Sequence, residues 1–218
     1  MSDPVISVLT VLLTSILFIV EPLQAVGVKA FGVVDFVSAL VLIGGAIFVS
    51  GSRIAAGASL VAFVMAGWAA LSRLTEPSTL DIYLKAGAWL ILGIVLGIVV
   101  GRAVFAQGRV NYHRFVGAIL VYLSVAVTFV ALFTIVGLLI PDAFSGMVFE
   151  DSPALASRVI YFSFVTLTST GYGDIYPIHP VARSLCNLES IIGQLYPATL
   201  LARLVSLEID GRRSVTLS

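Results

Sequence analysis

The residues best suited to chemistry lie in one stretch, T-L-T-S-T-G-Y-G-D at positions 166–174, within a chain rich in Leu, Val, Ile, Ala and Gly. Gly171 and Gly173 permit backbone angles that other residues avoid, so consecutive carbonyl groups can turn to one side. A row of carbonyl oxygens around a common axis can replace the hydration shell of a monovalent cation. Ser169 can add a hydroxyl at the inner end of the row, and Asp174 adds negative charge at the outer mouth. The stretch predicts a cation site made of backbone oxygens.

A short helix must position this stretch. Ser152 can cap a helix whose first turn contains Pro153, and we expect that helix to run to Thr168. Its apolar part, Val159 to Leu167, is too short to cross a membrane, for which about 20 residues are needed. We therefore predict a re-entrant helix. Its partly negative C-terminal end would point at a waiting cation.

The composition is that of an integral membrane protein. Of 218 residues, 59% are hydrophobic and 11% charged, and the mean hydropathy is +1.10. Soluble domains contain about 45 to 50% apolar and about 25% charged residues. The formal net charge of +0 gives no reason to expect a nucleic-acid partner. Cys186 is the single cysteine, which excludes an intrachain disulfide, and we expect a buried, inert thiol.

The apolar runs predict an all-α membrane fold with about six spans. They are Val5 to Gly27, Phe31 to Ser50, Ile54 to Leu71, Leu80 to Val104, Phe115 to Ile140 and Ser184 to Leu207. The first run lacks a preceding basic residue, so we expect a retained span rather than a cleaved signal peptide. Gly93, Gly97 and Gly101 recur every four residues, which favours close helix packing in lipid.

The charges predict the orientation. With both termini in the cytoplasm, seven basic residues fall inside and five outside, together with most of the acids. This modest bias favours cytoplasmic termini and places the segment 141–183 on the outer side. We expect a multi-pass protein of a bacterial inner membrane.

The stretch Ser169-Thr170-Gly171-Tyr172-Gly173-Asp174 resembles the selectivity filter of tetrameric potassium channels, whose usual form is T-V-G-Y-G-D. Thr166 and Thr168 before it, Tyr176-Pro177 after it and Arg183 match the simple bacterial members of that family. The resemblance covers roughly 115–207. It implies potassium ions bound by the carbonyls of Ser169, Thr170, Gly171 and Tyr172, with Tyr172 bracing the loop from behind.

The chain also departs from that family. Ser169 replaces the usual Thr, Thr170 replaces the usual Val, and the aromatic pair of the pore helix is Tyr161-Phe162 rather than two tryptophans. Val165 occupies a position where some relatives carry a buried glutamate. Because the ligands are carbonyls, potassium preference should survive, whereas Thr170 adds a hydroxyl behind the filter.

Gating and cavity residues are expected on the last helix. Gly193 resembles the hinge glycine of the family's inner helix, and Gln194 and Leu201 align with its usual cavity-lining positions. Pro197 could kink the helix near a gate or serve packing. Glu189, an intramembrane carboxylate, could face the ion pathway or hydrogen-bond the back of the pore helix; we favour the second role.

These features predict a homotetrameric, passive potassium channel surrounded by membrane lipid. Residues 1–110 would form a four-helix bundle, 111–208 a pore domain with outer helix, pore helix, filter and inner helix, and 209–218 a short cytoplasmic tail. The run 86–101 contains no Arg or Lys, so the bundle should not sense voltage through charged residues there. The sequence carries no nucleotide loop or metal cluster, so we expect neither an enzyme nor a cofactor beyond potassium ions in the filter. The alternatives are a poorly selective monovalent cation channel and a non-conducting scaffold or accessory subunit.

Overall fold

The computed structural model describes residues 3–28, 52–72, 78–105 and 112–216, with isolated positions between 37 and 45. Apart from those positions, the predicted span from Phe31 to Ser50 therefore lies outside the described residues. The elements, in chain order, are α1 (Asp3–Ser15), η1 (Ile16–Val20), α2 (Glu21–Ala25), α4 (Arg53–Ser72), α5 (Thr79–Val104), α6 (Tyr112–Leu139), β1 (Phe144–Ser145), α7 (Pro153–Leu167), β2 (Tyr176–Pro177) and α8 (Pro180–Thr216).

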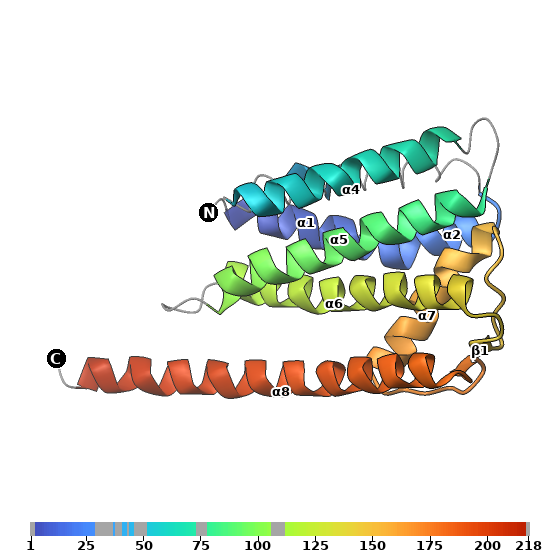
Figure 1. Cartoon of the computed structure of the whole chain (residues 1–218). Coiled ribbons are helices and arrows are strands. Elements are labelled where there is room, and N and C mark those ends of the chain that lie inside the picture. Colours follow the sequence, from blue (N-terminus) through green and yellow to red (C-terminus); the bar gives the residue numbers. More distant parts are fainter. Residues whose placement is uncertain are drawn as a thin grey trace.

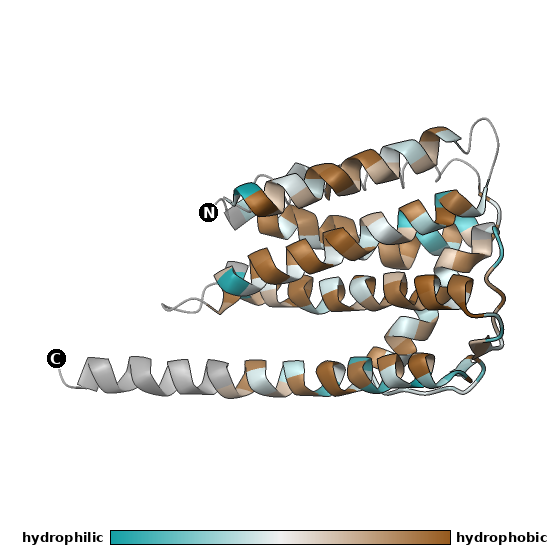
Figure 2. Cartoon of the chain, in the orientation of Figure 1, coloured by the Kyte–Doolittle hydropathy of each residue, from teal (hydrophilic) through white to brown (hydrophobic). Residues whose placement is uncertain are grey.

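Four helical segments of the described chain are long and apolar enough to cross a membrane. They are Pro4–Ala25, Arg53–Ser72, Thr79–Val104 and Arg114–Leu139, and their apolar character is plain in Figure 2. They match four of the six predicted spans, and the chain is a multi-pass membrane protein. The last helix, α8, begins four residues before the predicted Ser184 and extends beyond Leu207 to Thr216.

The first span contains a π-helical turn, η1, and Pro22 explains it. A proline in a helix has no N–H to donate, and its ring clashes with the carbonyl four residues earlier, here that of Phe18. Widening the helix into a π-turn relieves such a clash. The turn places the Phe18 ring 4.8 Å from that of Phe164 in α7. The first span thus reaches the short helix that precedes the predicted cation site.

Close packing between α5 and α6 is built on glycine. A Cβ added at Gly97 would lie 3.1 Å from Ser124 Oγ, and one at Gly93 would press on Thr128 of α6. The glycine spacing therefore predicted close packing correctly at these two positions, whereas Gly101 faces open space. Many of the buried apolar side chains of α5 and α6 belong to one core cluster. It also includes residues of α1, η1 and α4, and Ile160 of α7.

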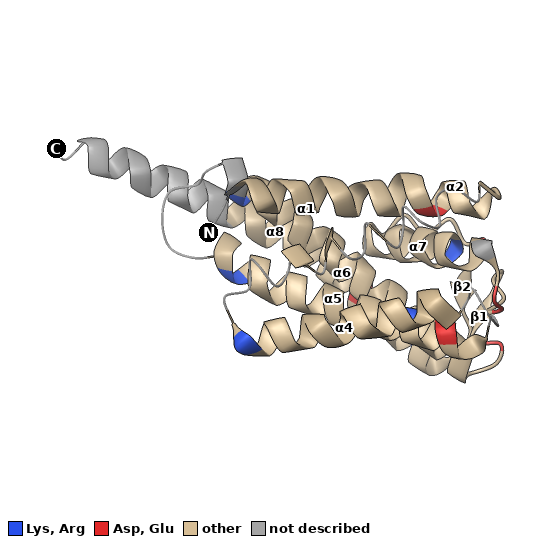
Figure 3. Ribbon diagram, turned by 90° about the horizontal axis from the view of Figure 1, so that it is seen from above, with Lys and Arg blue, Asp and Glu red and all other residues tan. Residues whose placement is uncertain are grey.

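Polar and charged side chains gather at the ends of the helices (Figure 3). At the start of α5, the Ser78 N–H donates to the Asp81 carboxylate at 3.0 Å, one half of a capping box. Among the described residues, acids gather toward the end of the molecule that carries β1 and β2, and the charges at the opposite end are basic (Figure 3). The helix α1 begins, and α8 ends, at this opposite end (Figure 1).

The segment between α6 and α8 folds back on itself. In Figure 1, α7 begins at the end of the molecule where α6 finishes and slants inward until it stops alongside α8. The chain then returns to the same end, where β2 pairs antiparallel with β1 through Phe144 with Pro177 and Ser145 with Tyr176. The loop 168–175 therefore lies between a helix that stops partway and a strand pair at the end of the molecule.

Candidate ion site

The helix α7 starts and stops as its sequence predicts. Ser152 adopts the extended backbone of an N-cap residue with Pro153 directly after it, although the Ser152 side chain makes no capping hydrogen bond. The helix has 15 residues, about 22 Å at 1.5 Å per residue. That length is less than the roughly 30 Å of a bilayer core, so α7 is too short to be a span.

The loop after α7 has an alternating backbone. Ser169, Gly171 and Gly173 have positive φ angles of 56°, 61° and 79°, and the residues between them do not. Glycine adopts this conformation freely, but serine does so at a cost. All residues from Thr168 to Asp174 are exposed in the single chain. Their carbonyl and hydroxyl oxygens are hard ligands of the kind that monovalent cations take.

Hydrogen bonds from the loop close the end of α7. The carbonyl of Val165 accepts from the N–H of Thr170 at 2.9 Å and from that of Gly171 at 3.3 Å. The carbonyl of Thr166 accepts from the N–H of Ser169 at 3.0 Å. The last carbonyls of a helix lack partners within it, so the loop satisfies the helix while the helix fixes the course of the loop.

One face of α8 contacts the end of α7 and the start of the loop. The Ser190 hydroxyl donates to the Thr166 carbonyl at 3.1 Å, and the Gln194 amide donates to Ser169 Oγ at 2.9 Å. Between them, Gly193 lies so close to the Leu167 carbonyl that a Cβ would collide with it. Residues three and four apart share a helix face. We call Ser190, Gly193 and Gln194 the clamp.

Aromatic side chains fix the two sides of α7. Tyr161 stacks parallel to Tyr172 of the loop, with ring centroids 6.3 Å apart. On the other side, Phe162 is buried against Phe133 of α6 and Phe144 of β1, with centroids 5.0 Å and 5.5 Å away. The aromatic pair predicted for this helix is thus divided between the loop and the core.

The C-terminal end of the loop is held by the strand pair and its neighbours. Gly146, with φ 81°, lies so close to the Asp174 carbonyl that no Cβ could fit between them. The Ala143 carbonyl accepts from the N–H of Ile178 at 2.8 Å, and Arg183 Nε donates to the Pro177 carbonyl at 3.2 Å. Both ends of the segment 168–177 are therefore anchored.

Glu189 is fully buried, with 0% of its surface exposed. Its Oε1 lies 2.5 Å from the Ser163 hydroxyl of α7, and Oε2 has no hydrogen-bond partner among the described residues. The same Ser163 hydroxyl lies 3.2 Å from the Ala126 carbonyl of α6. Of the two roles considered for Glu189, the structure has it contacting the back of α7.

The other residues predicted on the last helix are arranged differently. Gln194, Pro197 and Leu201 are exposed in the single chain, and α8 continues unbroken through Gly193 and Pro197. Gly193, predicted from the resemblance as a hinge, is a point of close contact in this structure. Sequence reasoning missed Ser163, Ser190 and Gly146. The signal that could have found the first two is their hydroxyl groups in apolar helices, which need partners.

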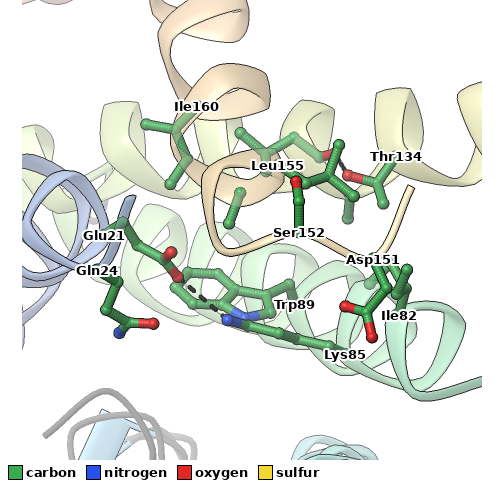
Figure 4. A pocket seen from close by; sticks show the side chains of 14 residues that line it. Glu21, Gln24, Ile82, Lys85, Trp89, Thr134, Asp151, Ser152, Leu155 and Ile160 are labelled. Atoms are coloured by element: carbon green, nitrogen blue, oxygen red, sulfur yellow. Dashed lines mark hydrogen bonds and ion pairs between the residues drawn. The ribbon is translucent and has the colours of Figure 1, made fainter. Parts of the chain in front are cut away.

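A small cavity of about 90 Å³ lies beside the first turn of α7, between α2, α5 and α6. Lys85 Nζ and Glu21 Oε1 are 3.2 Å apart across it, and Glu21 is only 2% exposed. Figure 4 shows Trp89 alongside Lys85, and Asp151 and Ser152 on the wall from which α7 starts. Among the described residues there is no group of three His, Cys, Asp or Glu side chains that could hold a metal ion.

Comparison with known proteins places an ion channel domain on this part of the chain. Residues 119–209 match a family model described as an ion channel. This stretch begins within α6, contains α7 and the loop, and ends within α8. No curated protein and no solved structure gives a significant match.

Proposed function

We propose that this protein is a homotetrameric, potassium-selective channel, with the loop 168–174 as its selectivity filter. The observation that carries the proposal is the positive φ at every second residue, Ser169, Gly171 and Gly173. A backbone that alternates in this way can direct successive carbonyl oxygens to one side, and rings of such oxygens replace the hydration shell of potassium. The match of residues 119–209 to an ion channel family supports the ion channel part of this proposal.

In this proposal, the potassium ligands are the carbonyls of Ser169, Thr170, Gly171 and Tyr172, with Asp174 at the outer mouth. The helix α7 is the pore helix, α6 the outer helix and α8 the inner helix. Residues 1–110 form a bundle beside the pore domain 111–208. Conduction is passive, and no cofactor takes part.

Four copies are needed because one chain supplies one side of a pore, and closed rotational symmetry completes it. The exposed surface of α8 supports assembly, since Leu188, Ile191 and Leu195 are 49%, 55% and 58% exposed in the single chain. We place the start of α1 and the end of α8 on the cytoplasmic side of an inner membrane. The basic residues at that end of the molecule agree with this orientation.

A second candidate, a poorly selective cation channel, is favoured by one contact. The Thr170 hydroxyl lies 2.8 Å from that of Thr168, where the resembled family has an apolar valine. A polar group behind the loop could alter its stiffness and hence its discrimination between ions.

Flux into proteoliposomes tests the proposal. With purified protein in potassium-loaded vesicles, potassium and rubidium should exchange and sodium and lithium should not. Gly173→Asp should abolish the flux, because φ at this position is 79° and aspartate adopts such angles at a cost. Equal potassium and sodium flux would support the non-selective candidate instead. No flux from folded protein that is monomeric or dimeric would indicate the scaffold.

A further inference from the structure

The contact between Glu189 and Ser163 contains one hydrogen, and either residue could supply it. The Ser163 hydroxyl has one hydrogen but lies within hydrogen-bond distance of two oxygens, Glu189 Oε1 at 2.5 Å and the Ala126 carbonyl at 3.2 Å. A backbone carbonyl can only accept. If Ser163 donates to Ala126, the hydrogen in the shorter contact must come from Glu189.

The surroundings of Glu189 favour the protonated acid. Its side chain is fully buried, and it makes no ion pair in the described part of the chain. The titratable groups that interact with it are Tyr122 of α6 and Cys186 of α8, and neither can carry positive charge. A buried carboxylate without a cation costs several kcal/mol.

The second carboxyl oxygen agrees with this assignment. Oε2 is buried without a hydrogen-bond partner. An unpartnered oxygen costs about 1–3 kcal/mol when it is neutral and more when it is charged. In a protonated acid, Oε1 carries the hydrogen and Oε2 is the neutral carbonyl oxygen, so the unpartnered atom is the one that is less costly to bury.

We propose that Glu189 is a neutral carboxylic acid that donates its hydrogen to Ser163, which in turn donates to the Ala126 carbonyl. This chain of two hydrogen bonds links α8, α7 and α6, and makes Glu189 a positioning residue for the pore helix. It directly precedes Ser190 of the clamp and lies one turn before Gly193, on the same face of α8 as that glycine. The consequence for the filter rests on the proposed function, whereas the protonation state of Glu189 does not.

Infrared spectroscopy of the full-length protein in lipid tests the protonation directly. The wild-type spectrum should contain a protonated-carboxyl C=O band that disappears in Glu189→Gln and persists in the control Glu150→Gln, an exposed glutamate of the outer loop. In Ser163→Ala the band should move to higher wavenumber, since the acid loses its acceptor. Absence of any band sensitive to Glu189→Gln would mean that Glu189 is ionised and would overturn the proposal.

The positioning role is tested by rescue. Glutamine keeps a neutral N–H donor for Ser163, so Glu189→Gln should keep near wild-type thermal stability and potassium flux, whereas Glu189→Ala should lose both. Loss in Glu189→Gln as large as in Glu189→Ala would overturn the positioning role. If wild-type protein shows no flux, the proposed function fails, but the infrared band and the stability comparison still decide the role of Glu189.

Discussion

At the scale of single residues, the position of the candidate filter depends on a few close contacts that α8 makes with the end of α7 and the loop. Gly193 meets the Leu167 carbonyl, a backbone atom that cannot rotate away. Ser169 holds a positive φ that serine usually avoids, and Gln194 donates to its hydroxyl. The clamp of Ser190, Gly193 and Gln194 therefore sets the position of the loop from the inner helix.

Gly193→Ala tests the close approach. The added methyl should push α8 away from α7, lower stability by about 1–3 kcal/mol, as overpacking does, and reduce potassium flux strongly. Thermal unfolding followed by size-exclusion chromatography measures the first effect. Gly101→Ala is the control, since it faces open space within α5 and should be neutral or stabilising. Equal behaviour of the two variants would refute the contact.

Gln194→Ala tests the hydrogen bond to Ser169. Its loss should cost only about 1 kcal/mol, so the protein should stay folded, but the ratio of potassium to sodium flux should fall severalfold because Ser169 loses the partner that holds its backbone. The control is Thr199→Ala, whose hydroxyl donates within its own helix, to the carbonyls of Leu195 and Tyr196. Unchanged selectivity in Gln194→Ala would show that Ser169 holds its conformation without this bond.

At the scale of elements, the segment between α6 and α7 and the first span both support α7 and the loop that follows it. The segment after β1 contacts the end of the filter loop at Gly146 and Asp174, and η1 contacts α7 through Phe18 and Phe164. The Lys85 and Glu21 ion pair lies beside the start of α7 (Figure 4). Elements far apart in the sequence thus meet on one short helix.

Gly146→Ala tests the contact between Gly146 and the Asp174 carbonyl. Gly146 and Gly27 both have positive φ, 81° and 92°, but only Gly146 has a neighbour that a methyl would meet. Both alanine variants should lose about 1 kcal/mol to backbone strain, and only Gly146→Ala should also reduce flux. A fall in flux for both, measured in matched proteoliposomes, would attribute the effect to strain alone.

The ion pair between α5 and α2 predicts that the two single variants of a double-mutant cycle lose different amounts of stability. Lys85→Met removes the ammonium group beside a carboxylate that is 2% exposed, whereas Glu21→Gln leaves a lysine that is 31% exposed and can reach water. Lys85→Met should therefore cost more stability, on the order of 3 kcal/mol, and the double variant less than the sum of the two. Additive losses in thermal unfolding would show that the two residues do not interact.

At the scale of the whole molecule, the sequence predicted the long helices because apolar length alone decides them in a membrane. It also predicted the start of α7 from Ser152 and Pro153, and close packing at Gly93 and Gly97, although it expected that packing within the first four spans rather than against α6. The positive φ of Ser169 and the close approach of Gly193 depend on α8 packing beneath α7, which no local pattern encodes. The pairing of Glu189 with Ser163 joins residues 26 positions apart, so the sequence left its role open.

Selective conduction of potassium through the loop 168–174 is tested most directly by a reversal potential. Purified protein in a planar bilayer, under opposed potassium and sodium gradients, should give currents that reverse near the potassium equilibrium potential. Gly173→Asp should lose or shift this reversal. A wild-type reversal near zero, with both ions carrying current, would contradict selective conduction.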